Sequence, residues 1–222
     1  MTLMRYTRPF PSVIAFALAV SSAHASQEGF VTPSWRGTPG TLYHGWESFT
    51  SSSGDPGSRP DLPGSGTAAT LFQHDPGAFI TGSGNIYNPG GISSFTLRQS
   101  SLDPVGLVVF QARTLGAELD YASVQLAYDV GAGTQLLMTS RTETDRGTLL
   151  GASVSSLWEW NLTDSGVTSF EIRFVADGSS LSLDSITLDT RSGGVVPEPS
   201  TWALMLLGVA GLAVRLRKAR HE

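Results

Sequence analysis

Few residues of this sequence have the types and spacing that nucleophilic or acid–base catalysis requires. The 222-residue sequence has no cysteine, which excludes a thiolate nucleophile, a thiolate zinc site and a disulfide framework. Neither the serine-hydrolase pattern G-x-S-x-G nor the zinc-peptidase pattern H-E-x-x-H occurs. Away from the chain ends the histidines are His44 and His74, and Pro76 and Gly77, which follow His74 closely, favour a turn there.

Carboxylates offer the remaining route to catalysis, because a glycoside hydrolase needs two of them facing each other. The candidates by residue type are Asp103, Glu118, Asp120, Glu143, Asp145 and Glu159. Any acidic sequence of this length contains such pairs, so we expect that the protein is not an enzyme. A secreted glycan-active hydrolase is the alternative, and it would require two acids and an aromatic-lined cleft to converge in the fold.

Aromatic side chains could bind sugars, because their rings fit the apolar faces of pyranoses. Four of them fall in segments with loop or edge-strand character, and we expect these to be available for glycan contact: Trp35, Tyr43, Trp46 and Tyr87. Trp158 and Trp160 share their alternation with Leu162, so we expect them in the core.

Short β-type runs position all these residues. Residues 105–112 are almost continuously apolar, which indicates a central strand buried on both faces, and residues 122–130 alternate with period two. In residues 181–189, Leu181 and Leu183 share one parity and Ile186 and Leu188 the other, which predicts a β-bulge near Asp184-Ser185. Further strands are expected within 42–49, 69–73, 79–81, 92–99, 134–140, 149–152, 154–162 and 167–175, with a polar loop at 141–147.

The fold class follows from these runs. No segment of useful length has helical periodicity, and about nine or ten short strands at regular spacing indicate an all-β protein. We predict an antiparallel β-sandwich of jelly-roll type. No internal repeat at a fixed period is visible, which disfavours a solenoid.

The closing pattern, residues 167–174 followed by 182–188, resembles the last strands of jelly-roll carbohydrate-binding modules. The resemblance implies that Asp184 helps to hold a structural calcium ion, and Glu47 is the residue whose position matches the usual early acidic companion. A Ca²⁺ site needs several oxygen ligands. In the alternative reading, Asp184 caps the bulge through hydrogen bonds to its own backbone. No other cofactor is expected.

The N-terminal residues 1–25 have the organisation of a secretory signal peptide. Arg5 and Arg8 precede the apolar run 13–20, and the small residues Ala23 and Ala25 form the cleavage site. We therefore expect this helix to be removed after Ala25. A first buried helix is the alternative, but the run is short for one.

The C-terminal residues have three parts in order. Val196, Pro197, Glu198 and Pro199 form a stiff polar motif. Residues 202–214 are apolar, shorter than the roughly 20 residues of a permanent membrane helix. Residues 215–222 form a basic tail that the positive-inside tendency keeps in the cytoplasm. An ordinary membrane anchor is one reading of this arrangement, and a transient sorting signal is the other.

This C-terminal arrangement resembles the PEP-CTERM sorting signal of Gram-negative, exopolysaccharide-producing bacteria. The resemblance implies a transient stay in the inner membrane, processing by an exosortase (a membrane-embedded cysteine transpeptidase) and transfer to the cell surface or the extracellular space. The same signature is also known as a C-terminal domain of ice-binding proteins. Ranks of Thr-x-Thr on a flat sheet would be expected for ice binding, and the sequence does not show them.

The expected organisation is therefore modular. After the signal peptide, a Gly/Pro/Ser-rich segment (26–66) contains one strand, the β-sandwich spans 67–190, and a linker with the polar motif (191–201) leads to the membrane segment. The net charge is −5 and the basic residues concentrate at the two ends, so nucleic acid is not an expected partner. We expect an exported, non-catalytic surface or matrix protein associated with exopolysaccharide.

Overall fold

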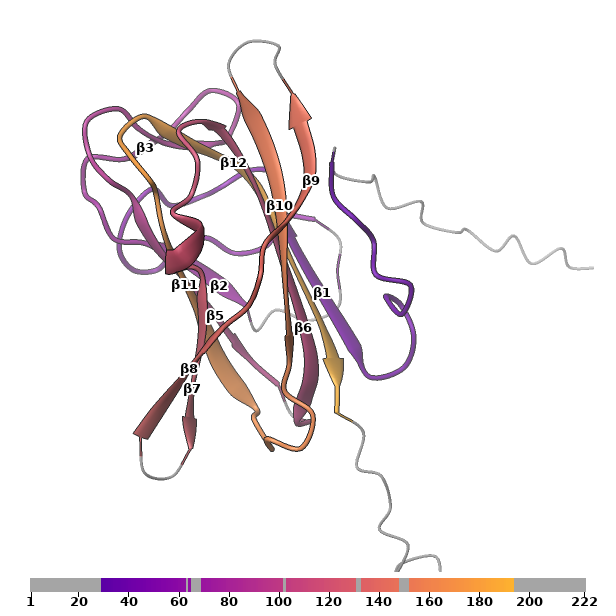
Figure 1. Ribbon diagram of the computed structural model, residues 1–222. Helices are drawn as coiled ribbons and strands as arrows, with labels where there is room; N and C mark the ends of the chain where they lie inside the picture. Colours follow the sequence, from indigo (N-terminus) through magenta and orange to yellow (C-terminus); the bar gives the residue numbers. More distant parts are fainter. Residues whose placement is uncertain are drawn as a thin grey trace, which may run out of the picture.

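Two antiparallel β-sheets packed face to face make up the described part of the protein (Figure 1). The computed structural model describes residues 29–62, 64, 69–101, 103–130, 133–147 and 152–193. The seven-stranded sheet has the order β3-β4-β12-β6-β10-β9, and β1 also pairs with β12. Its strands are β1 (Thr41–Trp46), β3 (Phe79–Ile80), β4 (Ile86–Asn88), β6 (Val105–Gly116), β9 (Thr142–Gly147), β10 (Ser153–Asn161) and β12 (Leu181–Ser192).

The five-stranded sheet has the order β2-β5-β11-β7-β8. Its strands are β2 (Thr70–Gln73), β5 (Ser94–Ser100), β7 (Gln125–Val130), β8 (Gly133–Met138) and β11 (Ser169–Val175), and the 3-10 turn η1 (Tyr121–Ser123) precedes β7. The predicted all-β, antiparallel β-sandwich is therefore confirmed. Among the described residues no helix is long and apolar enough to cross a membrane. The predicted signal peptide with Ala23 and Ala25, and the motif at 196–199, lie outside those residues.

A stack of aromatic rings joins the two sheets. Phe110 on β6 lies 5.6 Å from Trp158 on β10 and 5.1 Å from Phe174 on the opposite sheet, between ring centroids. Phe174 in turn stacks on Phe95 at 4.9 Å. Aromatic pairs of this geometry add about 0.5–1.5 kcal/mol each beyond the burial of their area. Trp158 and Trp160 are buried in this core, as their alternation predicts.

β12 is the strand on which the first sheet is organised, since β6 pairs along one side and β4 and β1 share the other. Its register against β6 shifts between Leu183 and Ser185, so Asp184 is the extra residue of a bulge. The bulge confirms the prediction made from the phase slip. It lets Leu181, Leu183, Ile186 and Leu188 all face the core.

The structure corrects two local predictions. Residues 142–147, expected to be a loop, form β9, an edge strand whose polar side chains face solvent or one another. An edge strand with two exposed faces has no reason to alternate apolar and polar residues, so its pattern looks like that of a loop. Strand β4 was not expected, because three residues are too few to show a period.

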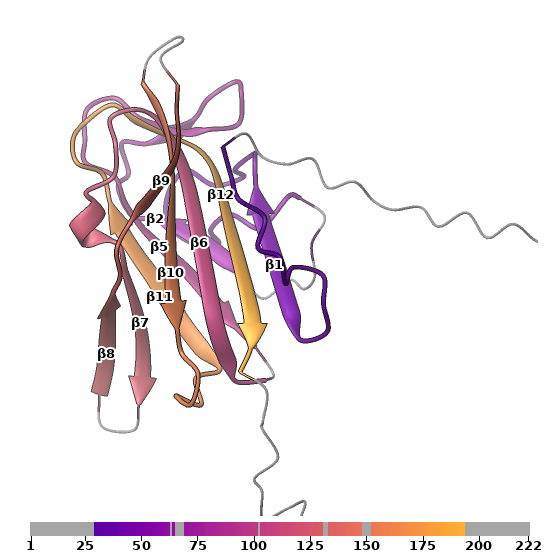
Figure 2. The same ribbon diagram turned by 45° about the vertical axis from the view of Figure 1, so that its right-hand side comes forward.

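The sandwich also begins earlier than residue 67. β1 pairs with β12 from Thr41↔Arg191 to Trp46↔Ile186. Residues 29–40 run over the outer face of the first sheet, where the backbone N–H of Val31 donates to the Gln111 side chain at 2.7 Å and its carbonyl accepts from the same amide at 2.9 Å. Figure 2 shows this segment in front of β12 and beside β1. We call residues 29–40 the strap.

Candidate functional site

Two of the four aromatic residues expected to contact glycans are buried. Trp46 faces the core with no exposed surface, and its indole N–H donates to the Ser58 carbonyl at 3.2 Å. Tyr43 lies under the strap, with the Arg36 guanidinium 4.0 Å above its ring. Because a covered ring cannot stack on a sugar, the structure removes Trp46 and Tyr43 from the predicted contacts. Both belong to β1, whose pairing with β12 and cover by the strap are long-range features.

Trp35 and Tyr87 are partly exposed, so glycan contact stays a prediction for these two. Tyr87 lies directly opposite Phe79 in the β3–β4 pair. The two rings meet edge to face at 5.6 Å, and Phe79 is 48% exposed. We call Phe79 and Tyr87 the aromatic pair. It presents apolar ring surface to solvent on the short β3–β4 hairpin at the edge of the seven-stranded sheet.

Of the two residues assigned to calcium, Asp184 has other side-chain partners and Glu47 is exposed. Asp184, at the bulge, accepts a hydrogen bond from the Asn85 amide at 2.9 Å and lies 3.6 Å from the Arg113 guanidinium. Glu47 follows the end of β1 with its side chain exposed. The described part of the chain holds no group of three or more His, Asp or Glu side chains suited to a metal ion. The calcium site therefore stays a prediction from sequence resemblance.

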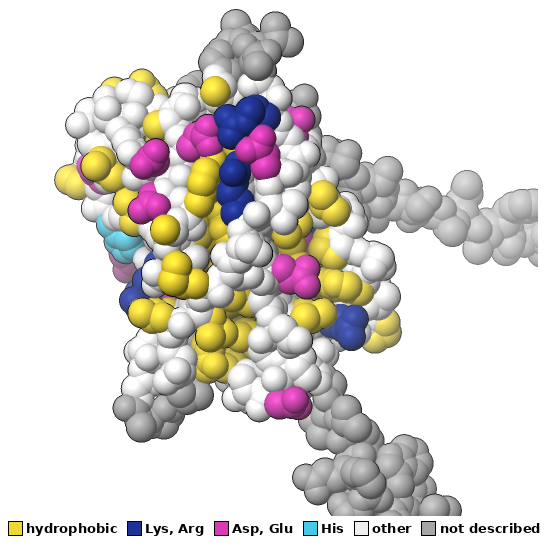
Figure 3. All heavy atoms as spheres, in the orientation of Figure 1, with side chains coloured by type: hydrophobic (Ala, Val, Ile, Leu, Met, Phe, Trp, Pro, Cys, Tyr) yellow, Lys and Arg dark blue, Asp and Glu magenta, His cyan; other side chains and the backbone are white. Residues whose placement is uncertain are grey.

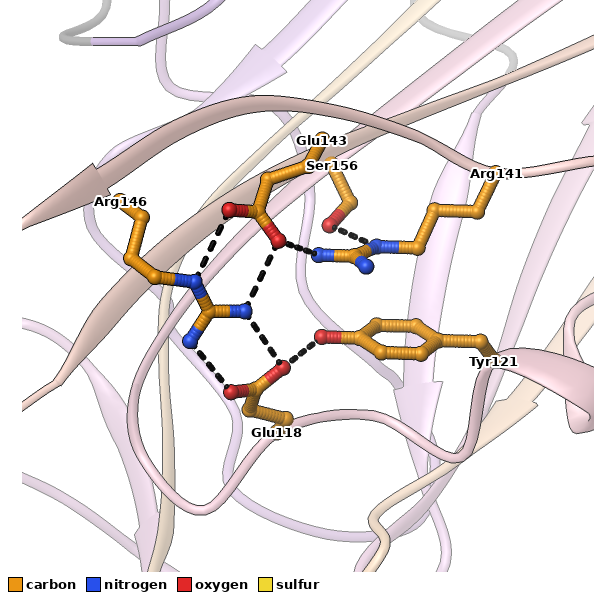
Figure 4. A network of polar contacts seen from close by, with 6 residues as sticks. All are labelled: Glu118, Tyr121, Arg141, Glu143, Arg146 and Ser156. Atoms are coloured by element: carbon orange, nitrogen blue, oxygen red, sulfur yellow. Dashed lines mark hydrogen bonds and ion pairs between the residues drawn. The ribbon is translucent and has the colours of Figure 1, made fainter.

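Two of the candidate carboxylates do meet. Arg146 on β9 lies between Glu118, which follows β6, and Glu143, also on β9 (Figure 4). Its guanidinium donates to Glu118 at 2.7 and 3.2 Å and to Glu143 at 2.9 and 2.8 Å. Figure 3 shows basic and acidic side chains grouped on the upper part of one face. The two carboxylates are thus bridged by one cation.

A second arginine completes this cluster. Arg141 donates to Glu143 at 2.6 Å and to the Ser156 hydroxyl on β10 at 2.8 Å. Its guanidinium also lies 3.7 Å above the ring of Tyr121 in η1, and the Tyr121 hydroxyl donates to Glu118. The cluster, which we name the Glu118–Arg146 cluster, therefore ties η1 and the end of β6 to β9 and β10.

The electrostatics of this cluster do not suit acid catalysis. Hydrogen bonds from Arg146 and then Arg141 lower the pKa of Glu143 to about 2. Hydrogen bonds from Arg146 to Glu143 and Glu118 raise the pKa of Arg146 above its ordinary value. A general acid needs a pKa raised toward the working pH, as for the acid of a glycosidase. Glu143 is instead held ionised, and the arrangement is that of a structural ion-pair network.

The other candidate carboxylates have separate places. Asp120 caps η1, accepting from the Ala122 N–H at 3.1 Å. Asp103 lies in the turn before β6, and Asp145 and Glu159 lie on β9 and β10.

His74, in the expected turn, hydrogen-bonds the Thr96 hydroxyl at 2.9 Å. His44 faces inward beside Trp46, and burial lowers its pKa to about 4.

A polar cleft opens where β7 separates from β11. The two strands pair only over residues 125–127 and 171–173, whereas β7 continues alongside β8 to Val130. The resulting hollow has a volume of about 350 Å³ and is lined by Tyr128, Asp129, Thr134, Ser165, Ser169 and Arg173, among others. Nearby, edge strand β8 exposes the side chains of Leu136 and Met138.

Sequence reasoning missed the Glu118–Arg146 cluster because it read 141–147 as a loop. The signal was present: in an extended strand Arg141 and Glu143 are two residues apart and lie on one face. The exposure of Phe79 and the separation of β7 from β11 have no comparable signal, because both depend on pairing between distant segments.

The last described residues, 192 and 193, lie immediately before the C-terminal motif in the sequence. The Ser192 N–H donates to the Gly40 carbonyl at 2.7 Å and the Gly193 N–H to the Pro104 carbonyl at 2.8 Å. Two residues later, residues 195–218 match the PEP-CTERM protein-sorting motif. The chain carries a PEP-CTERM sorting signal. This signal indicates export and processing by an exosortase, with sorting at the membrane before surface display.

The folded part is similar to two solved structures at low identity. One is the K1 cleaved adhesin domain of Lys-gingipain from Porphyromonas gingivalis W83, with 17% identity over 69% of this chain and 99% of that one, and a TM-score of 0.29. The other is the enzymatically active domain of tailspike protein 4 from bacteriophage CBA120, with 12% identity over 68% of this chain but 18% of that one, and a TM-score of 0.24. Comparison with curated protein sequences gives no match. At these values neither similarity bears on activity.

Proposed function

We propose that this PEP-CTERM protein is a non-catalytic component of the cell surface or extracellular matrix, and that it contacts exopolysaccharide through the aromatic pair. The supporting observation is the exposure of Phe79 in contact with Tyr87. Exposing a large apolar ring has a free-energy cost unless a partner covers it, and sugar rings stack on aromatic faces. The sorting signal, which indicates export and surface display, supports a proposal in which the partner is outside the cell.

The test is a glycan array probed with the processed protein purified from its host's surface or medium. Binding by the wild type and its loss in Phe79→Ala/Tyr87→Ala, with unchanged thermal unfolding, is the expected result. Asp129→Asn in the β7–β11 cleft is the matched variant, and it should bind as the wild type does. Binding that is lost in Asp129→Asn and retained in Phe79→Ala/Tyr87→Ala would contradict contact through the aromatic pair and would indicate contact in the cleft.

The second candidate, a glycan-active hydrolase, is favoured by the meeting of Glu118 and Glu143 at Arg146. It predicts release of reducing ends from the bound glycan and loss of that release in Glu118→Gln and Glu143→Gln. The ion pairing of both carboxylates supports the non-catalytic proposal instead. Binding without turnover would agree with the first candidate, and turnover would replace it.

A further inference from the structure

The tether between the fold and the sorting motif is very short. Gly193 is held by its hydrogen bond to Pro104, and Pro197 follows four residues later. Four Cα–Cα steps span at most about 15 Å in any conformation. A single helix with its side chains is about 10–12 Å thick. The surface of an enzyme that encloses the motif must therefore contact the end of the sandwich.

That end of the sandwich is well defined, and we call it the exit pole: residues 38–40, 103–105, 161–168 and 191–193. The register places these residues together, because Arg191 pairs with Thr41 on one side and with Leu107 on the other. The Leu162 N–H also donates to the Gly106 carbonyl at 2.7 Å. In Figures 1 and 2, β12 ends at the same end of the molecule as the turn after β10.

Two hollows open at the exit pole, and Ser192 near the end of the described chain lines both of them. One hollow, of about 640 Å³, is lined by Thr38, Leu107, Asn161, Arg191 and Gly193, among others. A second, of about 330 Å³, lies on the side of Thr41 and Asp103. Among the described residues that line the larger hollow, Arg191 is the one with a charged side chain. It is exposed, and no ion pair joins it to the described residues.

From the short tether, the hollows and the unpaired cation, we propose that the exit pole is a docking surface for the exosortase, with Arg191 receiving a carboxylate-bearing loop of that enzyme. The proposal rests on the sorting signal and is independent of glycan contact. The sandwich then contributes to recognition of the motif, in addition to the motif itself. Once the exosortase has bound the motif, the contact at the exit pole is an intramolecular one, because the tether is short. Such a second contact adds to the affinity.

The experiment uses the full chain in a host that contains the cognate exosortase, and it follows the ratio of processed to unprocessed protein by pulse-chase. Arg191→Glu should slow processing about two- to fivefold, the range that one partly exposed ion pair supplies. Arg191→Lys keeps the charge and should process close to the wild-type rate. Ten flexible residues inserted after Gly194 should also slow processing, because they uncouple the pole from the motif.

The decisive measurement combines the two changes. In the chain with the insertion, Arg191→Glu should have no further effect, since the pole no longer lies beside the bound motif. The same ten residues inserted between Gly178 and Ser179, away from the exit pole, control for effects on folding. An insertion after Gly194 that leaves processing unchanged or speeds it would overturn the proposal. So would an Arg191→Glu effect of equal size in both backgrounds, or Arg191-dependent binding of the unprocessed chain to lipid vesicles without exosortase.

Discussion

The carboxylate of Asp189 on β12 is completely buried and accepts two hydrogen bonds, at 2.6 and 2.7 Å, from Nε and Nη2 of Arg36, which lies in the strap 153 residues earlier. Asp189 lies directly opposite Tyr43 in the β1–β12 pair, and Arg36 covers the Tyr43 ring. One guanidinium thus neutralises a buried charge and covers an aromatic ring. The pair fixes the strap on the outer face of the sheet.

Removing Arg36 should destabilise the protein strongly. Arg36→Ala leaves the Asp189 carboxylate buried without its cation, and loss of one partner of a buried pair typically costs about 3–5 kcal/mol of the free energy of unfolding. Denaturant unfolding of the processed protein measures this. The double variant Arg36→Met/Asp189→Leu, which removes both charges, should recover most of the loss. Equal stability of the single and double variants would contradict the account.

The effect of Arg36→Ala should also depend on pH. Burial raises the pKa of Asp189, and hydrogen bonds from Arg36 oppose that rise. Without Arg36 the pKa rises further. A raised carboxyl pKa means that stability is present below the unfolded value and is lost as the pH rises through the folded value. Arg36→Ala should therefore be least harmful in acid and most harmful at neutral pH, whereas Asp189→Asn should show no such trend.

His44 predicts a loss of stability in acid. Its ring is buried, neither ring nitrogen has a hydrogen-bond partner among the described residues, and burial lowers its pKa from 6.5 to about 4. The unfolded chain then takes up the proton first, so stability is present above pH 6.5 and falls between pH 6.5 and about 4. The total is about 3 kcal/mol at about 1.4 kcal/mol per pKa unit. His44→Leu should remove this part of the pH dependence, and His74→Gln should retain it.

Whether a feature of the fold or of the candidate site could be predicted depends on how far apart in the sequence the residues that form it lie. The bulge at Asp184 was predictable, because the parity change between Leu183 and Ile186 is local. The burial of Tyr43 and Trp46 was not predictable, because it depends on the pairing of β1 with the distant β12 and on the strap that covers both strands. The Arg36–Asp189 pair was not predictable either, because the local sequence around each residue does not identify the other as its partner.

Trp160 links the two sheets where β8 leads into β9. Its indole N–H donates to the Leu137 carbonyl on β8 at 3.1 Å, so Trp160→Phe should cost about 1–3 kcal/mol beyond the lost apolar area, because the carbonyl is left unpaired. Trp158→Phe is the matched control on the same strand. The Trp158 indole N–H has no partner among the described residues, so its loss removes an unsatisfied donor. Equal costs for the two substitutions would contradict this role for Trp160.

Arg146 should control the ionisation of Glu143. In Arg146→Gln the two hydrogen bonds from Arg146 to Glu143 are lost and the one from Arg141 remains, so the pKa of Glu143 should rise from about 2 toward the ordinary carboxyl value without reaching it. NMR titration of the side-chain carboxyl carbon follows this directly. Arg173→Gln, which removes one arginine from Glu171 on the other sheet, should leave Glu143 unchanged. A Glu143 that still titrates near pH 2 in Arg146→Gln would mean that Arg141 alone holds the carboxylate ionised. The Glu118–Arg146 cluster would then have lost its bridge without losing its charge state.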